Sequence, residues 1–239
     1  MDAITLKLGA FLTLGPREKT MLEALQETAI TLKPGRDLIQ EGEHHHAAYI
    51  LRNGWACSHK QMRDGGRQII DIQIPGDFIG LRSLLLRTSD QGFTTLTDVE
   101  LAKIGTEKIW DMFRVTPRLA VALLWVASCD QAVVVEHLVN IGKRDALART
   151  AHFLLELGSR LSLVGHGEAD SYACPLSQSI LADALGVTAI HLNRVLRQLR
   201  EAKLLVFKDG VITILDRKRL AEMAGFDSIY LDHQPPVRD

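Results

Sequence analysis

The sequence is poor in cysteine and has no long apolar run. Its three cysteines, Cys57, Cys129 and Cys174, are scattered along 239 residues and form no CxxC pair. This pattern argues against a disulfide framework or a paired-cysteine metal site and is typical of a reducing cytoplasm. The longest apolar run, residues 119–129, is too short to span a bilayer. Because the N-terminus also lacks the basic-then-apolar pattern of a signal peptide, we expect a cytoplasmic protein with no membrane partner.

Net charge is also small, but it is unevenly distributed. The chain carries a formal charge of -1, which excludes a globally basic nucleic-acid coat protein. Residues 188–219 nevertheless contain eight basic and three acidic side chains. A local excess of about five positive charges is the kind of patch that attracts a phosphate backbone.

The first half of the chain has the texture of a small β domain. After a short amphipathic helix over residues 16–27, closely spaced Gly, Pro and Asn turns separate short β segments. Steps such as Asn53-Gly54 between alternating runs are hairpin signals, and they favour a β-roll or barrel. No strand leads into a Gly-rich helix start, so a Rossmann unit is excluded. The expected strands lie near residues 29–32, 37–40, 49–52, 55–63, 67–74 and 94–104.

One long helix follows, over residues 117–141, with Pro117 acceptable in its first turn. Apolar residues recur along it at steps of three and four, interrupted only by Gln131, and this spacing predicts a coiled-coil seam. The seam can pack within one chain or join two chains. Residues 143–163 are expected to continue as a second helix, with Arg144, Arg149 and Arg160 facing outward. The seam residues are Ala120, Leu124, Ala127, Val134, Leu138 and Ile141.

Residues 176–205 predict two helices joined by a tight turn. Ser177 is a good N-cap for the first helix, Gly186 tolerates the positive φ of the turn, and Thr188 can cap the second helix. This is a helix–turn–helix, although a soluble hairpin with a charged face explains the fragment equally well. The second helix places Leu192, Val195, Leu196 and Leu199 on one face, and Ile190, Asn193, Arg194, Arg197 and Glu201 on the other.

The residues after this hairpin make the DNA-binding interpretation more specific. Two short β runs flank Asp209-Gly210, which is a two-residue hairpin signal and fits the wing of a winged helix–turn–helix. Asp216 then caps a last short helix that ends at Gly225. The succession of helix–turn–helix, wing and closing helix is far more specific than any one part.

The string KPGRDLIQEGEHHHAAYILRNGWACSHKQMRDGGRQIIDIQIPGDFIG resembles the cyclic-nucleotide-binding β-roll of the Crp/Fnr regulators. Together with the helix–turn–helix, the resemblance covers nearly all of residues 25–231. It implies an α+β fold with an N-terminal β-roll of the jelly-roll-like, double-stranded β-helix type, a long dimerisation helix and a C-terminal winged helix–turn–helix. We expect a β-roll effector domain at 1–113, the dimer helix and hinge at 114–143, the DNA-binding domain at 144–231 and a flexible tail at 232–239.

The resemblance implies a sequence-specific transcription regulator rather than an enzyme. Its expected partners are a second copy of the chain, a pseudo-palindromic double-stranded DNA operator and RNA polymerase. Arg194 matches the family's base-contacting arginine, whereas Ile190 stands where the family has a glutamate and could meet a thymine methyl group. Asn193 and Arg194 are expected at base edges. The candidates for phosphate contacts are Ser177, Gln178, Thr188, His191, Arg197 and Lys208.

The expected effector pocket departs from the family's cyclic-nucleotide site. Leu81 follows the PGDFIG step where cyclic-nucleotide binders have a glutamate, and residues 89–93 contain no Arg-Ser pair for the phosphate. We therefore expect an effector other than cyclic AMP, or none. The family's oxygen sensors carry an N-terminal cysteine cluster, but this chain has no cysteine before Cys57. No cofactor is predicted, and the candidates for an unidentified small effector are Ile79, Gly80, Leu81, Arg82 and Ser83.

The sequence also leaves open a metal site, a cupin-like function and a redox-sensitive cysteine. The His44-His45-His46 run could bind a metal, but a solvated hairpin loop explains it more simply, and no metal site is predicted. A cupin-like β-roll that binds a metal or small ligand, with a C-terminal domain that does not read sequence, is the rival interpretation. The cupin pattern needs a Glu three or four residues beyond an HxH pair, and a second His after a PxG step. Residues 47–51 and the Pro75-Gly76-Asp77-Phe78 step supply neither. Cys174, next to the helix–turn–helix, is the one redox candidate.

Overall fold

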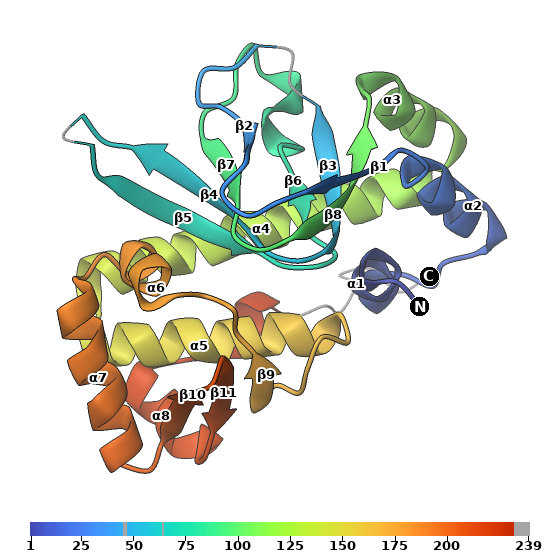
Figure 1. Cartoon of the computed structure of the whole chain (residues 1–239). Coiled ribbons are helices and arrows are strands. Elements are labelled where there is room, and N and C mark those ends of the chain that lie inside the picture. Colours follow the sequence, from blue (N-terminus) through green and yellow to red (C-terminus); the bar gives the residue numbers. More distant parts are fainter. Residues whose placement is uncertain (45–46, 64, 232–239) are drawn as a thin grey trace. The chain divides into compact units, whose positions relative to one another are not determined.

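Short strands separated by glycine turns make up most of the first half of the chain, as the sequence predicts (Figure 1). The computed structural model describes residues 1–44, 47–63 and 65–231. They fall into two units, one formed by residues up to 61 together with 71–130, the other by 62–70 and 131–231. Up to the long helix the elements are α1 (Ala3–Phe11), α2 (Pro16–Leu25), β1 (Ala29–Leu32), β2 (Asp37–Ile39), β3 (Ala48–Asn53), β4 (Ala56–Gln61), β5 (Arg67–Gln73), β6 (Phe78–Ile79), the 3-10 helix η1 (Arg82–Leu85), β7 (Gly92–Thr95), β8 (Val99–Ile104) and α3 (Thr106–Val115).

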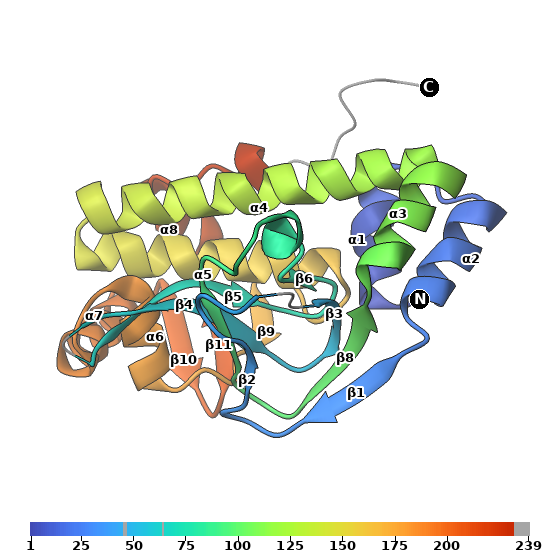
Figure 2. The same ribbon diagram turned by 90° about the horizontal axis from the view of Figure 1, so that it is seen from above.

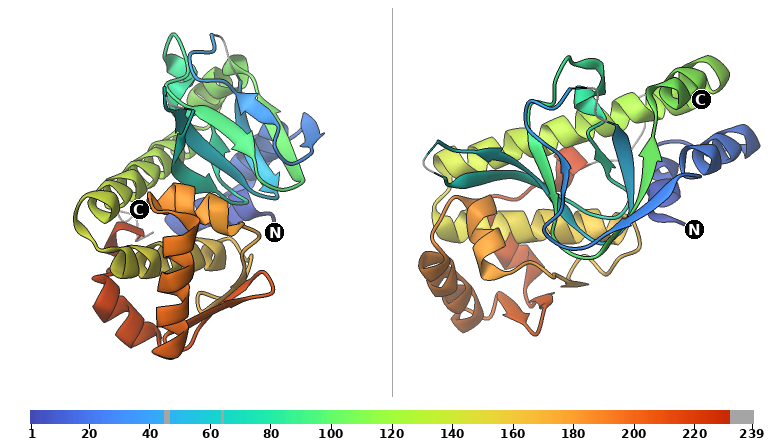
Figure 3. Two further views of the ribbon diagram at one scale, coloured as in Figure 1. Left: turned by 60° about the vertical axis from the view of Figure 1, so that its left-hand side comes forward. Right: turned by 45° about the horizontal axis from the view of Figure 1, so that its top comes forward.

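The strands form two four-stranded sheets whose order is that of a roll, with sequence neighbours often in different sheets. One sheet has the order β1-β8-β3-β6 and the other β2-β7-β4-β5, and the pairs with a recorded register are antiparallel. Figure 3 shows the ribbon of the roll from two sides. Apolar residues from both sheets meet inside it. Burial of each large apolar side chain contributes roughly 1.5–3 kcal/mol. This inner cluster consists of Ile39, Leu51, Ala56, Ile79, Phe93, Val99 and Leu101.

Glycine is required at the turn between β3 and β4. Gly54 has a φ of 83°, and a Cβ atom there would lie 2.1 Å from the backbone oxygen of Asp98. The preceding Asn53 side chain accepts a hydrogen bond from the Gly54 amide at 2.8 Å. The Asn-Gly signal in the sequence therefore marks a turn that no larger residue fits.

The structure corrects the predicted elements of the first half at several points. The single segment expected over residues 94–104 is two strands, β7 and β8, because Leu96, Thr97 and Asp98 turn the chain between them. The N-terminal helix α1, the helix α3 and the short strand β6 have no counterpart in the sequence prediction. In α1 apolar residues occur on most sides, so it lacks the periodicity that marks an amphipathic helix.

Helix α1 is fixed to the first unit by an apolar face and one buried charge. Ile4 and Leu8 are buried, and the ring of Phe11 stacks on Trp125 with centroids 4.8 Å apart. Lys7 Nζ donates to Asp77 Oδ1 at 2.6 Å, and both side chains are buried. The acid of the PGDFIG step also accepts from the Ile74 amide at 2.9 Å, so Asp77 joins α1 to the turn before β6.

Helix α4 (Pro117–Lys143) is the long helix predicted from the sequence, and its two faces differ sharply. Leu119, Ala122 and Val126 are buried, whereas the opposite side exposes a stripe of apolar residues. Five of the six predicted seam residues lie on the exposed side, but Ala120 is 5% exposed and belongs to the core, so its assignment to the seam was wrong. Among the described helices, α4 is the one long and apolar enough to cross a membrane by length and composition. The exposed stripe consists of Val121, Leu124, Ala127, Val134, Val135, Leu138 and Ile141.

The second unit is helical with one small sheet. Asp145 caps the start of helix α5, and its side chain accepts from the Ala148 amide. The C-terminal part of α4 lies beside α5 (Figure 2). Three strands pair in the order β10-β11-β9, and the Tyr172 hydroxyl donates to the Leu154 carbonyl of α5 at 2.6 Å. The elements are α5 (Ala146–Leu163), β9 (Ser171–Ala173), α6 (Gln178–Leu185), α7 (Ala189–Glu201), β10 (Leu205–Lys208), β11 (Val211–Ile214), α8 (Arg217–Ala224) and the 3-10 helix η2 (Ser228–Leu231).

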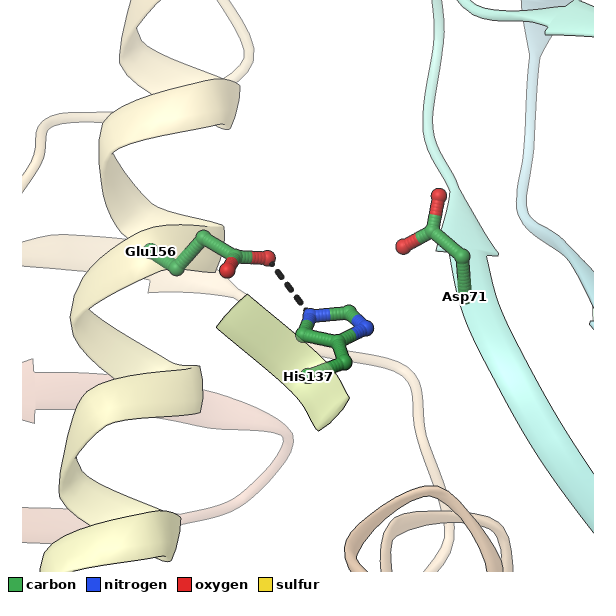
Figure 4. A group of neighbouring side chains, drawn as sticks. All are labelled: Asp71, His137 and Glu156. Carbon is green, nitrogen blue, oxygen red and sulfur yellow. Dashed lines mark hydrogen bonds and ion pairs between the residues drawn. The ribbon is translucent and has the colours of Figure 1, made fainter. Parts of the chain in front are cut away.

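A buried carboxylate joins three elements of this unit. Glu156 of α5 is fully buried and accepts from His137 Nε2 of α4 at 3.0 Å, which Figure 4 draws as a dashed line, and from the Tyr230 hydroxyl of η2 at 2.8 Å. Arg160 lies 3.5 Å away. Burial raises the pKa of Glu156, but His137, Arg160 and Tyr230 more than offset this and lower it to about 2. The carboxylate is therefore ionised in the folded protein.

His152, one turn before Glu156, is held in the neutral form. It is 1% exposed, and its Nδ1 atom lies 3.2 Å from the side-chain nitrogen of Asn140. Burial and then the positive charge of Arg144 lower the pKa of His152 to about 4. Its ring stacks near Tyr230 and meets Phe226 edge-on. The Glu136 carboxylate lies 3.4 Å from Nε2 and favours the charged ring, but burial and Arg144 outweigh it.

The lowered pKa values of His152 and Glu156 predict that acid destabilises the fold. The pKa of each is lower in the folded state than in the unfolded chain, so stability falls as the pH drops, from about 6.5 to 4 for His152 and from about 4.5 to 2 for Glu156. His152→Phe keeps the ring but cannot take a proton. Urea unfolding at a series of pH values should therefore show a loss of about 2–3 kcal/mol between pH 6.5 and 4 in the parent and a flatter profile in the variant. His166→Phe, in an exposed loop, is the control, and equal slopes in all three proteins would contradict the prediction.

Candidate nucleic-acid interface

The turn between α6 and α7 forms through the residues that the sequence singles out. The Ser177 hydroxyl accepts from the Ile180 amide at 3.3 Å, and the Thr188 hydroxyl accepts from the His191 amide at 3.2 Å. Each hydroxyl satisfies an amide that has no partner within its helix. Gly186 ends α6 in the left-handed conformation with a φ of 61°. The two helices are therefore capped and turned as predicted, and Figure 3 shows α7 crossing the end of α6.

Helix α7 turns one face into the unit and the other into solvent. Leu192, Val195 and Leu199 are buried against the rest of the second unit, while Leu196 is half-buried. On the outer face Ile190 is 69% exposed, which is unusual for a large aliphatic side chain unless a partner covers it. The sequence prediction of this outer face is confirmed, since Ile190, Asn193, Arg194, Arg197 and Glu201 are all exposed.

The polar side chains on the outer face differ in their partners. Arg197 Nε donates to Glu201 Oε1 at 2.8 Å along the helix, and this bond raises the pKa of Arg197. Asn193 Nδ2 donates to Gln178 Oε1 of α6 at 2.6 Å. Within the described part of the chain, Arg194 makes no hydrogen bond or ion pair. Its guanidinium therefore keeps all of its donors for a ligand.

The wing beside α6 and α7 is a two-residue hairpin. Asp209 and Gly210 both have positive φ, 52° and 73°, as the type I′ turn requires. Lys208, the last residue of β10, has a side chain 78% exposed and lies 3.9 Å from the Asp209 carboxylate. A shallow groove of about 360 Å³ runs between the wing and the start of α6. It is lined by Cys174, Pro175, Leu176, Ser177, Gln178, Phe207, Asp209 and Gly210.

The effector-pocket candidates lie in the first unit, and most of them are buried or already paired. Ile79 is fully buried in β6, and Gly80 turns the chain with a φ of 72° before half-buried Leu81. Ser83 is buried and its hydroxyl donates to the Gly80 carbonyl at 3.4 Å. Arg82 pairs with Asp90 at 2.6 Å. The one positive charge among these candidates is therefore already matched by a carboxylate.

The two remaining candidates, the histidine run and Cys174, receive no support from the structure. His44 forms an isolated bridge with Thr88, and His45 and His46 lie outside the described residues. Cys174 is 1% exposed, and burial raises the pKa of its thiol to about 11. A buried, protonated thiol reacts slowly with oxidants, so its surroundings do not favour the redox hypothesis.

Comparison with known proteins identifies both halves of the chain. The model of the cyclic nucleotide-binding domain matches residues 29–115, and the model of the Crp-like helix-turn-helix domain matches residues 148–223. The chain belongs to the Crp/Fnr family. It is a DNA-binding transcription regulator.

Relatives of this Crp/Fnr regulator match it over most of their length. The nitrogen fixation regulation protein FixK of Rhizobium meliloti is 29% identical over 75% of this chain and 79% of its own. The fumarate and nitrate reduction regulatory protein of Vibrio cholerae is 25% identical over 89% and 85%. The solved structure of FixK2 from Bradyrhizobium japonicum aligns with a TM-score of 0.74 and 25% identity, over 82% of this chain and 96% of that one.

Sequence reasoning missed the residue that fixes the end of α6 in this Crp/Fnr regulator. Arg149 was expected to face outward with Arg144 and Arg160, but all three are half-buried. Arg149 donates through Nη1 to the Leu185 carbonyl at 2.7 Å, and through Nη2 to the carbonyls of Ile141 and Arg144 at 3.2 and 3.1 Å. Helical periodicity could not reveal this, because the acceptors are backbone carbonyls that carry no sequence signal.

The backbone conformations of Gly186 and Gly142 predict opposite effects of alanine substitution on the free energy of unfolding. Gly186→Ala should lower the free energy of unfolding by about 1 kcal/mol, because alanine resists a positive φ. Gly142→Ala, inside α4 with no atom within 4 Å of the new methyl group, should raise it by up to about 1 kcal/mol. Urea unfolding measures both, and an unchanged or raised free energy of unfolding for Gly186→Ala would contradict the assigned conformation of Gly186.

Proposed function

We propose that this regulator acts as a homodimer that reads a pseudo-palindromic operator with one α7 helix in each half-site. The observation that carries the proposal is the exposed apolar stripe of α4, on which Leu138 is 72% and Leu124 61% exposed. A row of exposed aliphatic side chains on a long helix is stable in water when a second helix covers it. A second copy of α4 offers the same row by symmetry, and this supports a two-fold interface rather than a lipid contact.

The outer face of α7 supplies the proposed sequence readout. Arg194 is free to donate two parallel hydrogen bonds to guanine, and exposed Ile190 fits a thymine methyl group. Asn193 is assigned to a base edge beside them. Gln178, a phosphate candidate in the sequence, is instead hydrogen-bonded to Asn193 and is left out of this set. The side chains proposed to contact phosphates, and so to set the register, are Ser177, Thr188, His191, Arg197 and Lys208.

The effector is proposed to differ from cyclic AMP. The motif position after Gly80 holds Leu81 in place of an acid, and the guanidinium of Arg82 is already paired with Asp90. A cyclic phosphate would meet that carboxylate rather than a free cation. An unidentified ligand near Ile79, Gly80, Leu81, Arg82 and Ser83, or control by abundance alone, fits these contacts.

The remaining assignments follow from the proposed role. We divide the chain into an effector domain at 1–113, a dimer helix and hinge at 114–143 and a DNA-binding domain at 144–231, while the expected tail at 232–239 lies outside the described residues. A cytoplasmic location, contact with RNA polymerase and the absence of enzymatic activity belong to the same proposal.

The dimer is tested by a charge on the stripe. Leu138→Glu should convert the protein to a monomer at micromolar concentration, because it places two carboxylates against each other across the two-fold axis. Light scattering gives the molar mass directly. Leu215→Glu makes the same change at a leucine that is 53% exposed outside α4 and should remain dimeric. A monomeric parent protein would contradict the proposal at once.

The DNA-reading role is tested at Arg194. Operator selection with the purified protein supplies the cognate site, and binding is then compared on that site and on random DNA. Arg194→Ala should cost about 1–3 kcal/mol on the cognate site and much less on random DNA. Lys208→Ala, a proposed phosphate contact, should weaken both by similar factors. Equal losses on both DNAs for Arg194→Ala would refute the base-reading role, and the absence of any selected sequence would favour a β-roll ligand-binding protein instead.

A further inference from the structure

The hydrogen bond between Gln178 and Asn193 is the one direct side-chain link found between α6 and the outer face of α7 among the described residues. It is short, 2.6 Å, and joins the first residue of α6 to the fifth residue of α7. Both side chains are exposed, so the bond stabilises the fold by little. Its position on the face that would meet DNA suggests a different role.

The two helices hold this pair at a fixed separation. Both helix starts are capped, by Ser177 and Thr188, and Gly186 sets the turn between them. Arg149 fixes the end of α6 through the Leu185 carbonyl. The backbones that carry Gln178 and Asn193 are therefore positioned before any DNA binds, and only the two side chains have rotamer freedom to lose.

The bond also determines what Asn193 can offer a base. An asparagine amide has two N–H hydrogens and one carbonyl oxygen. The Gln178 oxygen takes one hydrogen, which leaves one N–H and the carbonyl oxygen for a base. Adenine presents a matching acceptor, N7, and donor, N6–H, in the major groove, whereas guanine presents two acceptors there.

We propose that Gln178 is a positioning residue that presents Asn193 to an adenine in each operator half-site. The proposal rests on the proposed function, since it requires α7 to read a sequence. An amide that is already oriented loses less rotamer entropy when it binds, and this favours the matched base over others. Gln178 then acts on specificity through Asn193, whereas a phosphate contact by Gln178 would act on every sequence alike.

The test is operator selection followed by binding to the selected site and to sites changed at single positions. The parent should prefer adenine at one position of each half-site. Asn193→Ala should reduce that preference by roughly 5- to 150-fold. Gln178→Ala should reduce it at the same position by about threefold to tenfold, with binding to random DNA unchanged. The double variant should match Asn193→Ala alone, because Gln178 has no other route to the base.

Two further variants separate positioning from simple contact. Gln178→Glu keeps an acceptor for the Asn193 amide but adds a negative charge, so it should retain the adenine preference while binding all DNA more weakly. Gln198→Ala removes an exposed glutamine elsewhere on α7 and should leave the preference unchanged.

Three outcomes would overturn the inference in distinguishable ways. If the parent selects no sequence, the proposed function itself fails. If it selects a sequence and Gln178→Ala keeps the full adenine preference, or loses affinity equally on all DNA, Gln178 is a phosphate contact or a bystander. If the position read by Asn193 prefers a base other than adenine, the assigned amide orientation is wrong. Equal thermal midpoints for all variants establish that differences arise at the interface.

Discussion

The hydrogen bonds donated by the guanidinium of Arg149 are the interaction on which the helix–turn–helix depends. It donates to the carbonyls of Ile141 and Arg144 at the end of α4, and to that of Leu185 at the end of α6. Carbonyls at helix ends have no partner within the helix and attract a positive charge. One side chain therefore satisfies the ends of two helices, and the turn of the helix–turn–helix is connected to the end of the helix that carries the apolar stripe.

A second set of buried charges surrounds the same junction. Glu156 accepts from α4 through His137 and from η2 through Tyr230, and Arg144 contacts Glu136, Asn140 and the Gly225 carbonyl. Paired, hydrogen-bonded charges of this kind add little net stability compared with apolar packing, but removing one partner is costly. Removing any one partner would therefore leave an uncompensated charge or polar group between α4, α5 and the C-terminal helices.

Local signals in the sequence were enough to predict the helix–turn–helix, its caps and the wing. Ser177, Gly186, Thr188 and the Asp209-Gly210 step each depend on the conformation of a few neighbouring residues, which covalent geometry restricts strongly. The exposed face of α7 followed from helical periodicity alone. These features carry the candidate site, so most of it could be predicted.

Long-range polar contacts could not be predicted in the same way. The sequence predicted that Arg149 faces outward, yet it contacts a carbonyl 36 residues away, and Lys7 contacts an aspartate 70 residues away. The pairing of Gln178 with Asn193 depends on the angle between two helices, which no sequence pattern records. Helix α1 was missed because apolar residues occur on most of its sides, although Asp2 caps it. Helix α3 has an apolar face with Ile109 and Met112 buried, so its periodicity was a signal that could have revealed it.

Helix α1 shows how the N-terminal segment is committed in this member of the family. Ile4, Leu8 and Phe11 are part of the same apolar cluster as α4, and Lys7 neutralises the aspartate of the PGDFIG turn. The family's oxygen sensors, by the resemblance noted above, use cysteines near the N-terminus. A cysteine at any of the five buried positions of α1 would remove apolar packing or the Lys7–Asp77 ion pair; these positions are Ala3, Ile4, Lys7, Leu8 and Phe11. A new sensing chemistry at these five positions would therefore have to arise together with a rebuilt core.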